Sequence, residues 1–236
     1  MPRRLLPFAL LAVAAAAPAA QRKVQITSFE RMRVEGPFQV AVITGRSPTA
    51  TISGDPRRLE RVDVRVDGRT LVIRTPAGLA REERGAESGP SAPIQIMLGT
   101  PTLTSATAIG GGALTIAGGR VPRLDLSVAG AGSIAFASAE VEQVNATVIG
   151  NGQITLAGRA ARARLLINGA GRIDADGLEA GELIVRMDGP GEATARARFI
   201  ADVTNTGLGR VTVAGAPKCT VKNVAGGPVE CGAPAR

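Results

Sequence analysis

A pair of glycines separated by one residue recurs along the second half of this chain at intervals of about twenty residues. The pairs are Gly110/Gly112, Gly130/Gly132, Gly150/Gly152, Gly169/Gly171, Gly189/Gly191 and Gly207/Gly209. A nearly constant period of this length, in a segment rich in valine, isoleucine, leucine and alanine, indicates stacked repeats that contact only their neighbours. The repeat therefore favours a stacked architecture over a fold built around one globular core.

Within each repeat, apolar residues alternate with polar ones. The positions two, four and six residues before the first glycine, and four and six after it, are apolar except at Thr104 and Asn205. A period of two is typical of half-buried β-strands. A small residue eight positions after the first glycine predicts a second bend, and an apolar residue such as Val121, Val141 or Phe199 is expected to close a third side.

Equivalent strands of successive repeats are expected to lie side by side in parallel register. The handedness of parallel connections favours right-handed winding. The sequence thus predicts an all-β fold, a single-chain right-handed parallel β-helix with coils of about twenty residues. The alternative is an antiparallel sandwich or propeller, which requires hairpin turns between short strands, and the repeat region lacks those turns.

The predicted β-helix forms one domain over residues 21–236. Residues 24–75 have strand character without the period, and we expect less regular coils there, including a hairpin turn at Asp67-Gly68. Residues 76–92 are rich in glycine, glutamate, arginine, serine and proline, a composition typical of an exposed loop. The regular coils are expected from residue 93 to 232, between an irregular N-terminal cap and a C-terminal cap.

The first twenty residues have the pattern of a signal peptide. Arg3 and Arg4 precede an apolar stretch from Leu5 to Ala17, and Ala17-Pro18-Ala19 resembles a cleavage site. A membrane anchor is the less favoured alternative, because a bilayer-spanning helix needs about 20 apolar residues. We therefore expect export, to the periplasm or outside the cell, and no membrane span.

The chain has two cysteines, Cys219 and Cys231, both near its C-terminus. An even number of cysteines in an exported protein indicates a disulfide. Closing this loop would stabilise the fold by about 3 kcal/mol and would tie the C-terminal cap. A metal site or a redox pair is less favoured, because there is no Cys-x-x-Cys spacing and no histidine.

Composition argues against several functions. The absence of histidine rules out Ser-His-Asp and Cys-His catalysis and argues against a zinc site. The net charge of +8 comes from scattered charges of both signs, and no tryptophan or tyrosine is present to stack on bases, so nucleic acid is not an expected partner. The glycine pairs recur in every repeat, which indicates bends rather than phosphate binding. No cofactor or metal is expected.

Three carboxylates offer the main alternative, a carbohydrate-active enzyme such as a polysaccharide lyase or hydrolase. Asp174 and Asp176 lie two residues apart, and Asp188 follows one repeat later. Such a group could bind Ca²⁺ or act as general acid and base. We favour solvated, mutually compensated charges instead, because equivalent positions in successive repeats alternate in sign as an outward ladder. That ladder comprises Ser133, Gln153, Arg172, Glu192 and Arg210.

Columns of threonine and arginine supply candidate binding residues on the outer surface. The candidates are Thr107, Thr147, Thr155, Arg172, Arg186, Thr194, Arg210 and Thr212. Flat rows of hydroxyl groups can bind glycans, although threonine is also a common residue on the outward face of a strand. The oligomeric state is left open.

The segments VAGAGSI, VIGNGQI and INGAGRI, together with the earlier VEGPFQVAVITG, resemble the auto-transporter adhesin head-domain family, also called the GIN domain. The resemblance implies an exported bacterial β-helix with an adhesive or binding role and carries over no catalytic residues. The chain departs from the family pattern in its later repeats, at Met187, Pro190 and Asn205. We expect a non-enzymatic protein of the cell envelope that binds a glycan or another envelope protein; a periplasmic partner-binding module in envelope regulation is a further alternative.

Overall fold

The structure is a computed structural model and describes residues 20–76 and 93–233. Apart from Ala20, the predicted signal peptide lies outside the described residues, and so does the predicted loop apart from Pro76. The elements of the described residues are β1 (Ala20–Val24), β2 (Arg31–Glu35), β3 (Gln39–Thr44), β4 (Thr49–Gly54), α1 (Pro56–Leu59), β5 (Asp63–Asp67), β6 (Thr70–Arg74), β7 (Gln95–Thr100), β8 (Ser105–Gly110), β9 (Ala113–Ile116), β10 (Gly119–Gly130), β11 (Ser133–Gly150), β12 (Gln153–Asn168), β13 (Arg172–Asp188), β14 (Glu192–Asn205), β15 (Arg210–Gly215), β16 (Lys218–Asn223) and β17 (Val229–Ala233).

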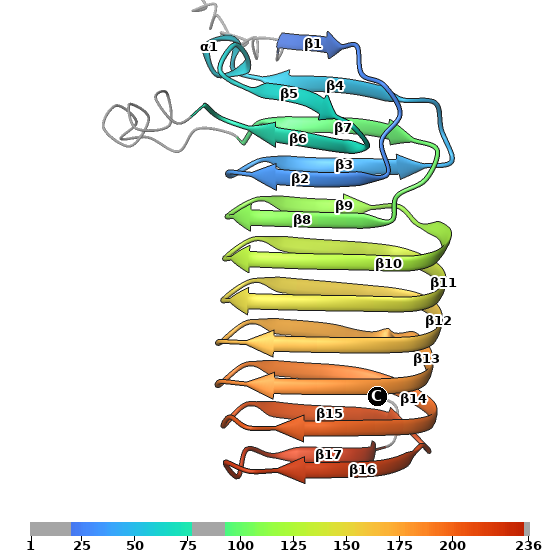
Figure 1. Ribbon diagram of the computed structural model, residues 1–236. Helices are drawn as coiled ribbons and strands as arrows, with labels where there is room; N and C mark the ends of the chain where they lie inside the picture. Colours follow the sequence, from blue (N-terminus) through green and yellow to red (C-terminus); the bar gives the residue numbers. More distant parts are fainter. Residues whose placement is uncertain (1–19, 77–92, 234–236) are drawn as a thin grey trace, which may run out of the picture.

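The chain winds into a parallel β-helix, as the repeat predicts (Figure 1). Each regular coil has two long sides. We call the side formed by the strand segments before each glycine pair wall 1, and the side formed by the segments after it wall 2. In Figure 1 the chain runs to the left along the near wall, turns, and returns along the far wall as it descends, which is a right-handed path.

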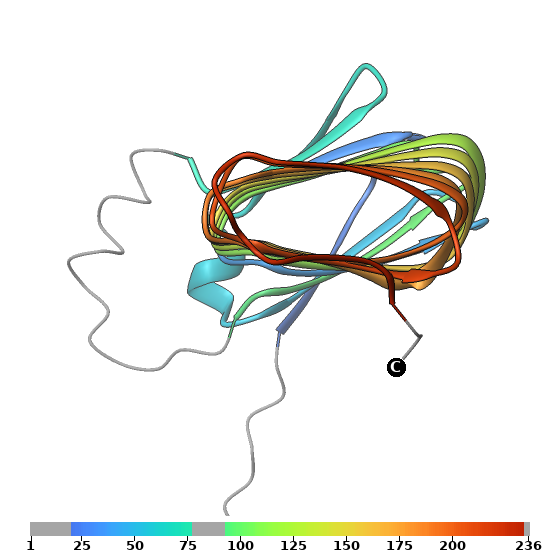
Figure 2. The same cartoon turned by 90° about the horizontal axis from the view of Figure 1, so that it is seen from below.

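Seen along its axis, the coil is a flattened oval (Figure 2). The glycine pairs form a tight edge where wall 1 turns into wall 2. The opposite end, which we call the round edge, contains residues 119–122 in the first regular coil and their equivalents below. The predicted third side is therefore a short, rounded end, and several of the long strands continue through it.

The inward residues form one continuous apolar core between the walls. On wall 1, Val128 lies between Ala108 and Val148 in parallel register, and on wall 2 Ile134 lies between Leu114 and Ile154. All of these side chains are buried. The predicted alternation is thus confirmed, because the residues at the apolar positions point between the walls.

The N-terminal coils are not stacked in sequence order. β2 lies between β6 and β8, and β3 lies between β7 and β9, all in parallel register. The first coil of the chain is therefore inserted between two coils that follow it in the sequence. The parallel order ends beyond the coil formed by β6 and β7, since β4 pairs antiparallel with β7, and β1 pairs antiparallel with β4.

A hairpin and a short helix complete this end of the molecule. β5 and β6 pair antiparallel around the predicted turn, where Gly68 has φ +59°. Helix α1 begins after Asp55, whose carboxylate accepts a hydrogen bond from the amide of Arg57 at 2.9 Å. The helix places Leu59 in the core. Asp-Pro at the start of a helix is a recognised signal, and the sequence analysis missed it.

The two glycines of each pair have different roles. The first has a positive φ in every pair except Gly207/Gly209, for example +105° at Gly130 and +99° at Gly150, a conformation that favours glycine. The second is buried and lies against the coil above: a Cβ on Gly152 would lie 2.3 Å from Val128 Cγ1 and 2.8 Å from Gly132 O. Only the second glycine faces inward. A strict alternation with a period of two would place both glycines inward, because they lie two residues apart.

Two inward polar side chains near the C-terminal end, Asn205 and Asn223, form hydrogen bonds with backbone groups of the tight edge. Asn205 is fully buried; its amide donates to the Gly209 carbonyl at 2.9 Å, and its oxygen accepts from the Gly207 amide at 3.1 Å. Asn223, its neighbour in the next coil, donates to Gly227 O at 2.7 Å. These hydrogen bonds satisfy the side chains, so the departure at Asn205 leaves the coil register intact.

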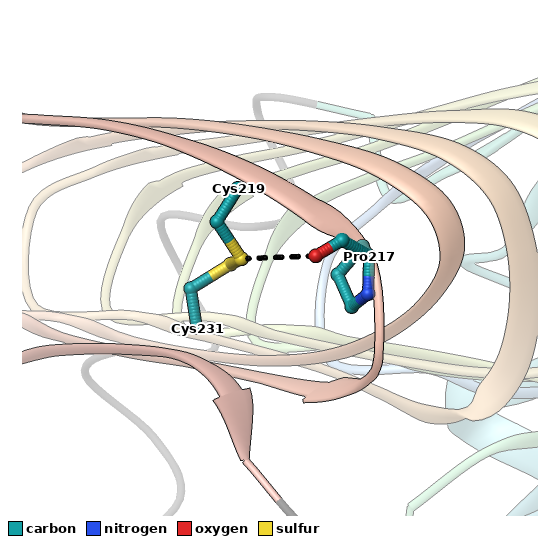
Figure 3. The surroundings of a disulfide bond; sticks show 3 residues. All are labelled: Pro217, Cys219 and Cys231. Carbon is teal, nitrogen blue, oxygen red and sulfur yellow. Dashed lines mark hydrogen bonds between the residues drawn. A yellow bond between two sulfur atoms is a disulfide. The ribbon is translucent and has the colours of Figure 1, made fainter.

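The predicted disulfide is present and closes the lower end of the β-helix. Cys219 continues the inward column of Ala201 on wall 1, and Cys231 continues that of Val213 on wall 2. Their bond therefore crosses from one wall to the other inside the last coil (Figure 3). Pro217 O lies 3.7 Å from Cys219 Sγ, a contact rather than a hydrogen bond because a disulfide sulfur has no hydrogen to donate.

We expect Gly152→Ala to lower the free energy of unfolding by roughly 1–3 kcal/mol, because the added Cβ overlaps Val128 and the backbone of the preceding coil. Gly111→Ala is the matched control, since a Cβ there meets no atom within 4 Å and its φ is not positive. Chemical denaturation of both variants measures the difference. Equal stabilities would contradict the role of close stacking at the tight edge.

Reducing the disulfide is expected to lower the stability of the last coil by about 3 kcal/mol and to promote end-to-end association through the freed strand edges. Thermal unfolding and light scattering, with and without reductant, measure the two effects. A Cys219→Ala/Cys231→Ala variant serves as the control, because it should behave like the reduced protein and be insensitive to reductant. An unchanged melting temperature in reductant would show that the disulfide does not hold this end.

Candidate functional site

The round edge carries an open groove of about 820 Å³ that crosses five successive coils. Its lining residues are Arg120, Val121, Pro122, Glu140, Val141, Glu142, Arg159, Ala160, Ala161, Glu179, Gly181, Arg198 and Phe199. The floor is apolar and comes from the residues that close the coil at this edge. Charged side chains stand along its rim.

The lower end of the groove is shaped by a missing side chain and an exposed ring. A Cβ on Gly181 would lie 2.8 Å from Ala161 O and 3.7 Å from Phe199 Cδ2, so glycine keeps the floor low there. Phe199 is 61% exposed, and the Arg198 guanidinium lies 5.1 Å from its ring centroid. The expectation that Phe199 closes the coil from inside is therefore wrong, since its ring faces the groove.

The charges on the rim neutralise one another. Arg120 Nε donates to Glu140 at 2.7 Å, and Glu179 lies between Arg159 at 3.8 Å and Arg198 at 3.2 Å. Exposed pairs of this kind contribute at most about 1 kcal/mol each to stability. Their main effect here is on ligand choice, because a neutralised rim around an apolar floor offers little attraction to a highly charged ligand.

Two smaller hollows continue the groove from the round edge onto wall 1. One of about 320 Å³ is lined by Pro122, Arg123, Glu142, Gln143, Ala161 and Arg162. The next, of about 120 Å³, is lined by Gln143, Arg162, Ala163, Arg164, Glu182 and Ile184. Each shares residues with the one before it, so the three hollows adjoin.

A polar cluster on wall 1 borders these hollows. Arg123 Nε donates to Asp125 at 3.0 Å, and Asn145 Nδ2 donates to the same carboxylate at 2.6 Å. Burial favours a higher pKa for Asp125, but the hydrogen bonds from Arg123 and Asn145 and the charge of Arg123 outweigh it and lower the pKa. The carboxylate is therefore ionised and paired, and it is not a proton donor at neutral pH.

The predicted threonine and arginine candidates do not form one face. Thr107, Thr147 and Arg186 lie on wall 1. Thr155, Arg172, Thr194, Arg210 and Thr212 lie on wall 2. The two walls face opposite directions (Figure 2), so a single ligand lying on one wall cannot contact both groups.

On wall 2 the predicted ladder of charges is present. Arg172 lies in register between Gln153 and Glu192, and its guanidinium is 2.6 Å from the Glu192 carboxylate. Arg210, next in the column, is 3.9 Å from Glu230. The guanidinium groups of Arg172 and Arg210 are therefore engaged by the carboxylates of Glu192 and Glu230.

The three aspartates do not converge. Asp174 on wall 2 accepts from Thr194 Oγ1 at 3.1 Å, and Asp176 pairs with Arg196 at 3.2 Å. Asp188 lies on the other wall, beside Asn168. Within the described ranges, no three potential metal-ligating side chains gather closely enough to hold an ion. Asp174 and Asp176 are therefore each engaged by a neighbouring side chain, and Asp188 is separated from both.

The groove is not predicted by the alternation of the sequence. The alternation predicts that the apolar residues at this edge close each coil, and Val121 and Ala160 do so, since each is only 6% exposed. The signal that could have found the groove is the run of short side chains, Ala160, Ala161 and Gly181, beside longer charged ones in adjacent coils.

The model of the family described as "putative auto-transporter adhesin, head GIN domain" matches residues 28–217, well over half of the chain. The chain belongs to this family. The match confirms the resemblance carried by the glycine motifs and supports an adhesin-like binding role. No match is found among curated proteins.

Several solved structures have the same fold. A putative adhesin from Bacteroides fragilis has a TM-score of 0.79 at 21% identity, covering 91% of this chain and 97% of that one. A putative lipid binding protein from Parabacteroides distasonis has a TM-score of 0.72 at 17% identity, covering 90% and 96%. A putative adhesin from Parabacteroides merdae has a TM-score of 0.67 at 18% identity, covering 90% and 95%. At these identities the likeness establishes the fold alone.

In the part of the chain that the structure describes, no helix combines the length and apolar character needed to cross a bilayer.

We expect Ca²⁺ at millimolar concentration to leave the melting temperature unchanged, because the carboxylates of Asp174 and Asp176 are engaged and Asp188 lies on the opposite wall. Differential scanning fluorimetry with and without chelator measures this. Asp174→Ala should respond to Ca²⁺ as the wild type does. A Ca²⁺-dependent rise that Asp174→Ala abolishes would revive the enzyme alternative.

Proposed function

We propose that this protein is an exported, non-enzymatic binding protein of the bacterial cell envelope, and that the groove at the round edge is its main contact surface. The observation that carries the proposal is the groove itself: a concave apolar floor with a charged rim, whose described charges other than Glu142 are paired with one another. Concave, mostly apolar surfaces with a few polar groups are the usual form of ligand sites. Family membership supports the adhesin-like character of that binding.

The arrangement of the titratable groups supports a role without catalysis. Asp188 lies on the opposite wall from Asp174 and Asp176, and those two carboxylates are held by a hydroxyl and a guanidinium. In an enzyme, a general acid and a general base must both reach the reacting atoms. The groove instead contains carboxylates that are engaged by arginines at its rim, as Glu179 and Glu140 are.

Export is supported by two features. The N-terminal residues have the charge, apolar stretch and small residues of a signal peptide. The disulfide between Cys219 and Cys231 is a bond that persists in oxidising compartments and is rare in the cytosol. The periplasm and the cell exterior both satisfy this condition.

The candidate ligands are an envelope glycan, another envelope protein and a lipid. One protein of the same fold is described as a putative lipid binding protein. The apolar floor of the groove and the exposed ring of Phe199 favour a ligand with an apolar portion.

A glycan array and a pull-down from envelope extract, both with residues 21–236, test the proposal. We expect binding that weakens at least about tenfold in Ala161→Asp, which places a charge on the apolar floor. Thr155→Ala on wall 2 is the control and should retain binding. Absence of binding in both assays, or loss of binding only in Thr155→Ala, would contradict the proposed surface. Cell fractionation tests the location, and a cytosolic protein would contradict export.

A further inference from the structure

We propose that the groove and the two hollows beside it form one site for a single-chain anionic lipid. The acyl chain lies in the groove at the round edge, and the acidic head lies on wall 1 against Arg164 and Arg186. This inference rests on the proposed function, because it assigns a ligand class to the same groove. It is carried by the continuity of the site, its size and its unequal distribution of free charge.

The three hollows form a continuous path. The groove and the middle hollow share Pro122, Glu142 and Ala161, and the middle hollow and the last one share Gln143 and Arg162. The path begins beside Phe199 and ends at Arg164 and Ile184. It therefore turns from the round edge onto a flat wall.

Size and curvature favour a small, flexible ligand. The groove volume of about 820 Å³ lies within the range of small-molecule sites. Five coils spaced by about 4.8 Å give it a length of about 19 Å. A path that bends around an edge suits an unbranched chain with free rotation about its bonds, whereas a rigid helix of a partner protein would contact only one part of it.

The groove suits the apolar part of such a ligand. Its floor consists of valine, alanine and glycine, and Phe199 adds an exposed aromatic face at one end. Apart from Glu142, the described rim charges are paired, as Arg120 is with Glu140 and Arg159 with Glu179. A polar ligand group placed on this floor would lose water without gaining a partner, while a methylene chain gains about 0.8 kcal/mol per buried CH₂.

The far end of the path suits an acidic head. Arg162 is held by Glu182 at 3.3 Å, but neither Arg164 nor Arg186 makes an ion pair with any described carboxylate. Arg164 lies in register between Asn145 and Ile184, and Arg186 between Leu166 and Thr204. Asp188 and Asp202 are exposed carboxylates on the same face, but neither forms an ion pair with Arg164 or Arg186. Both guanidinium groups therefore remain available for charge-assisted, bidentate hydrogen bonds to a carboxylate or phosphate.

Aliphatic side chains connect the two arginines to the path. Leu166 lies two residues from Arg164 on the same strand face, directly beside Arg186, and is 37% exposed. Ile184 lines the last hollow and is the neighbour of Arg164 in the next coil. An exposed and a half-buried aliphatic side chain beside unpaired cations match the junction of an acidic head and an acyl chain. Glu142, the one carboxylate at the bend without an ion pair among the described residues, is exposed to solvent.

Parinarate, a naturally fluorescent polyene fatty acid, is the probe. The chain has no tryptophan or tyrosine, so the protein contributes little background fluorescence. Titration into residues 21–236 below the micelle concentration should give saturable one-to-one binding. Hexadecanoate should displace the probe, and hexadecyltrimethylammonium, with the same chain and a cationic head, should do so at least about tenfold less well.

Variants assign the two ends of the site. Arg164→Glu/Arg186→Glu should weaken hexadecanoate about tenfold or more and remove its advantage over the cationic analogue. Ala161→Asp should weaken both ligands. Arg31→Glu is the charge-reversal control, because Arg31 lies in the same wall-1 column as Arg164, several coils away, and makes no ion pair with a described carboxylate. Leu208→Ser, at the tight edge with a 71% exposed side chain, is the apolar control. Both controls should bind as the wild type does.

Three results would overturn the inference: no saturable binding, equal displacement by the two heads, or affinity unaffected by the arginine and Ala161 variants. If the array or pull-down yields a ligand that Ala161→Asp abolishes while parinarate does not bind, the lipid assignment fails and the proposed function stands. If nothing binds in any assay, both fail.

Discussion

The fold depends on how closely the backbone of one coil approaches the next at the tight edge. There the second glycine of each pair lies directly against the carbonyl groups of the pair above, at a distance that leaves no room for a Cβ. The same contact recurs in every regular coil, so the turns stack without offset. Every column of side chains on both walls inherits its alignment from this stack, including the apolar core and the charged ladders.

Because the columns are aligned, the chemistry of the surface is set by which residues occupy equivalent positions in neighbouring coils. On wall 2 and on the groove rim, opposite charges alternate and cancel, as at Arg172 and Glu192. On wall 1 the pattern breaks at Arg164 and Arg186, whose column neighbours carry no carboxylate. The surface available to a ligand is thus defined by the interruptions of a regular pattern rather than by a dedicated loop or domain.

Much of the architecture follows from the sequence, because period and parity are local signals. They identify the coils and the inward columns, whereas the disulfide that joins two of those columns is predicted from the even number of cysteines. The alternation with a period of two distinguishes inward from outward side chains, but it does not distinguish wall 1 from wall 2. For this reason the sequence alone groups Thr107 and Thr155 on one outer surface. That distinction requires counting from the glycine pair, since residues before and after it face opposite ways. The groove depends on side-chain lengths across adjacent coils, and the position of β2 and β3 depends on pairings that no local period encodes.

The insertion of the β2–β3 coil between later strands has a consequence for how the molecule assembles. Residues 31–44 are made early, yet the strands on either side of them, β6 with β7 and β8 with β9, end as far along as Ile116. A chain that emerges from its N-terminus cannot complete this coil until about half of its length is available. The lower coils, by contrast, pair with immediate neighbours in sequence and can add one at a time. Assembly of this rod is therefore expected to propagate in one direction from a late-forming nucleus near its top.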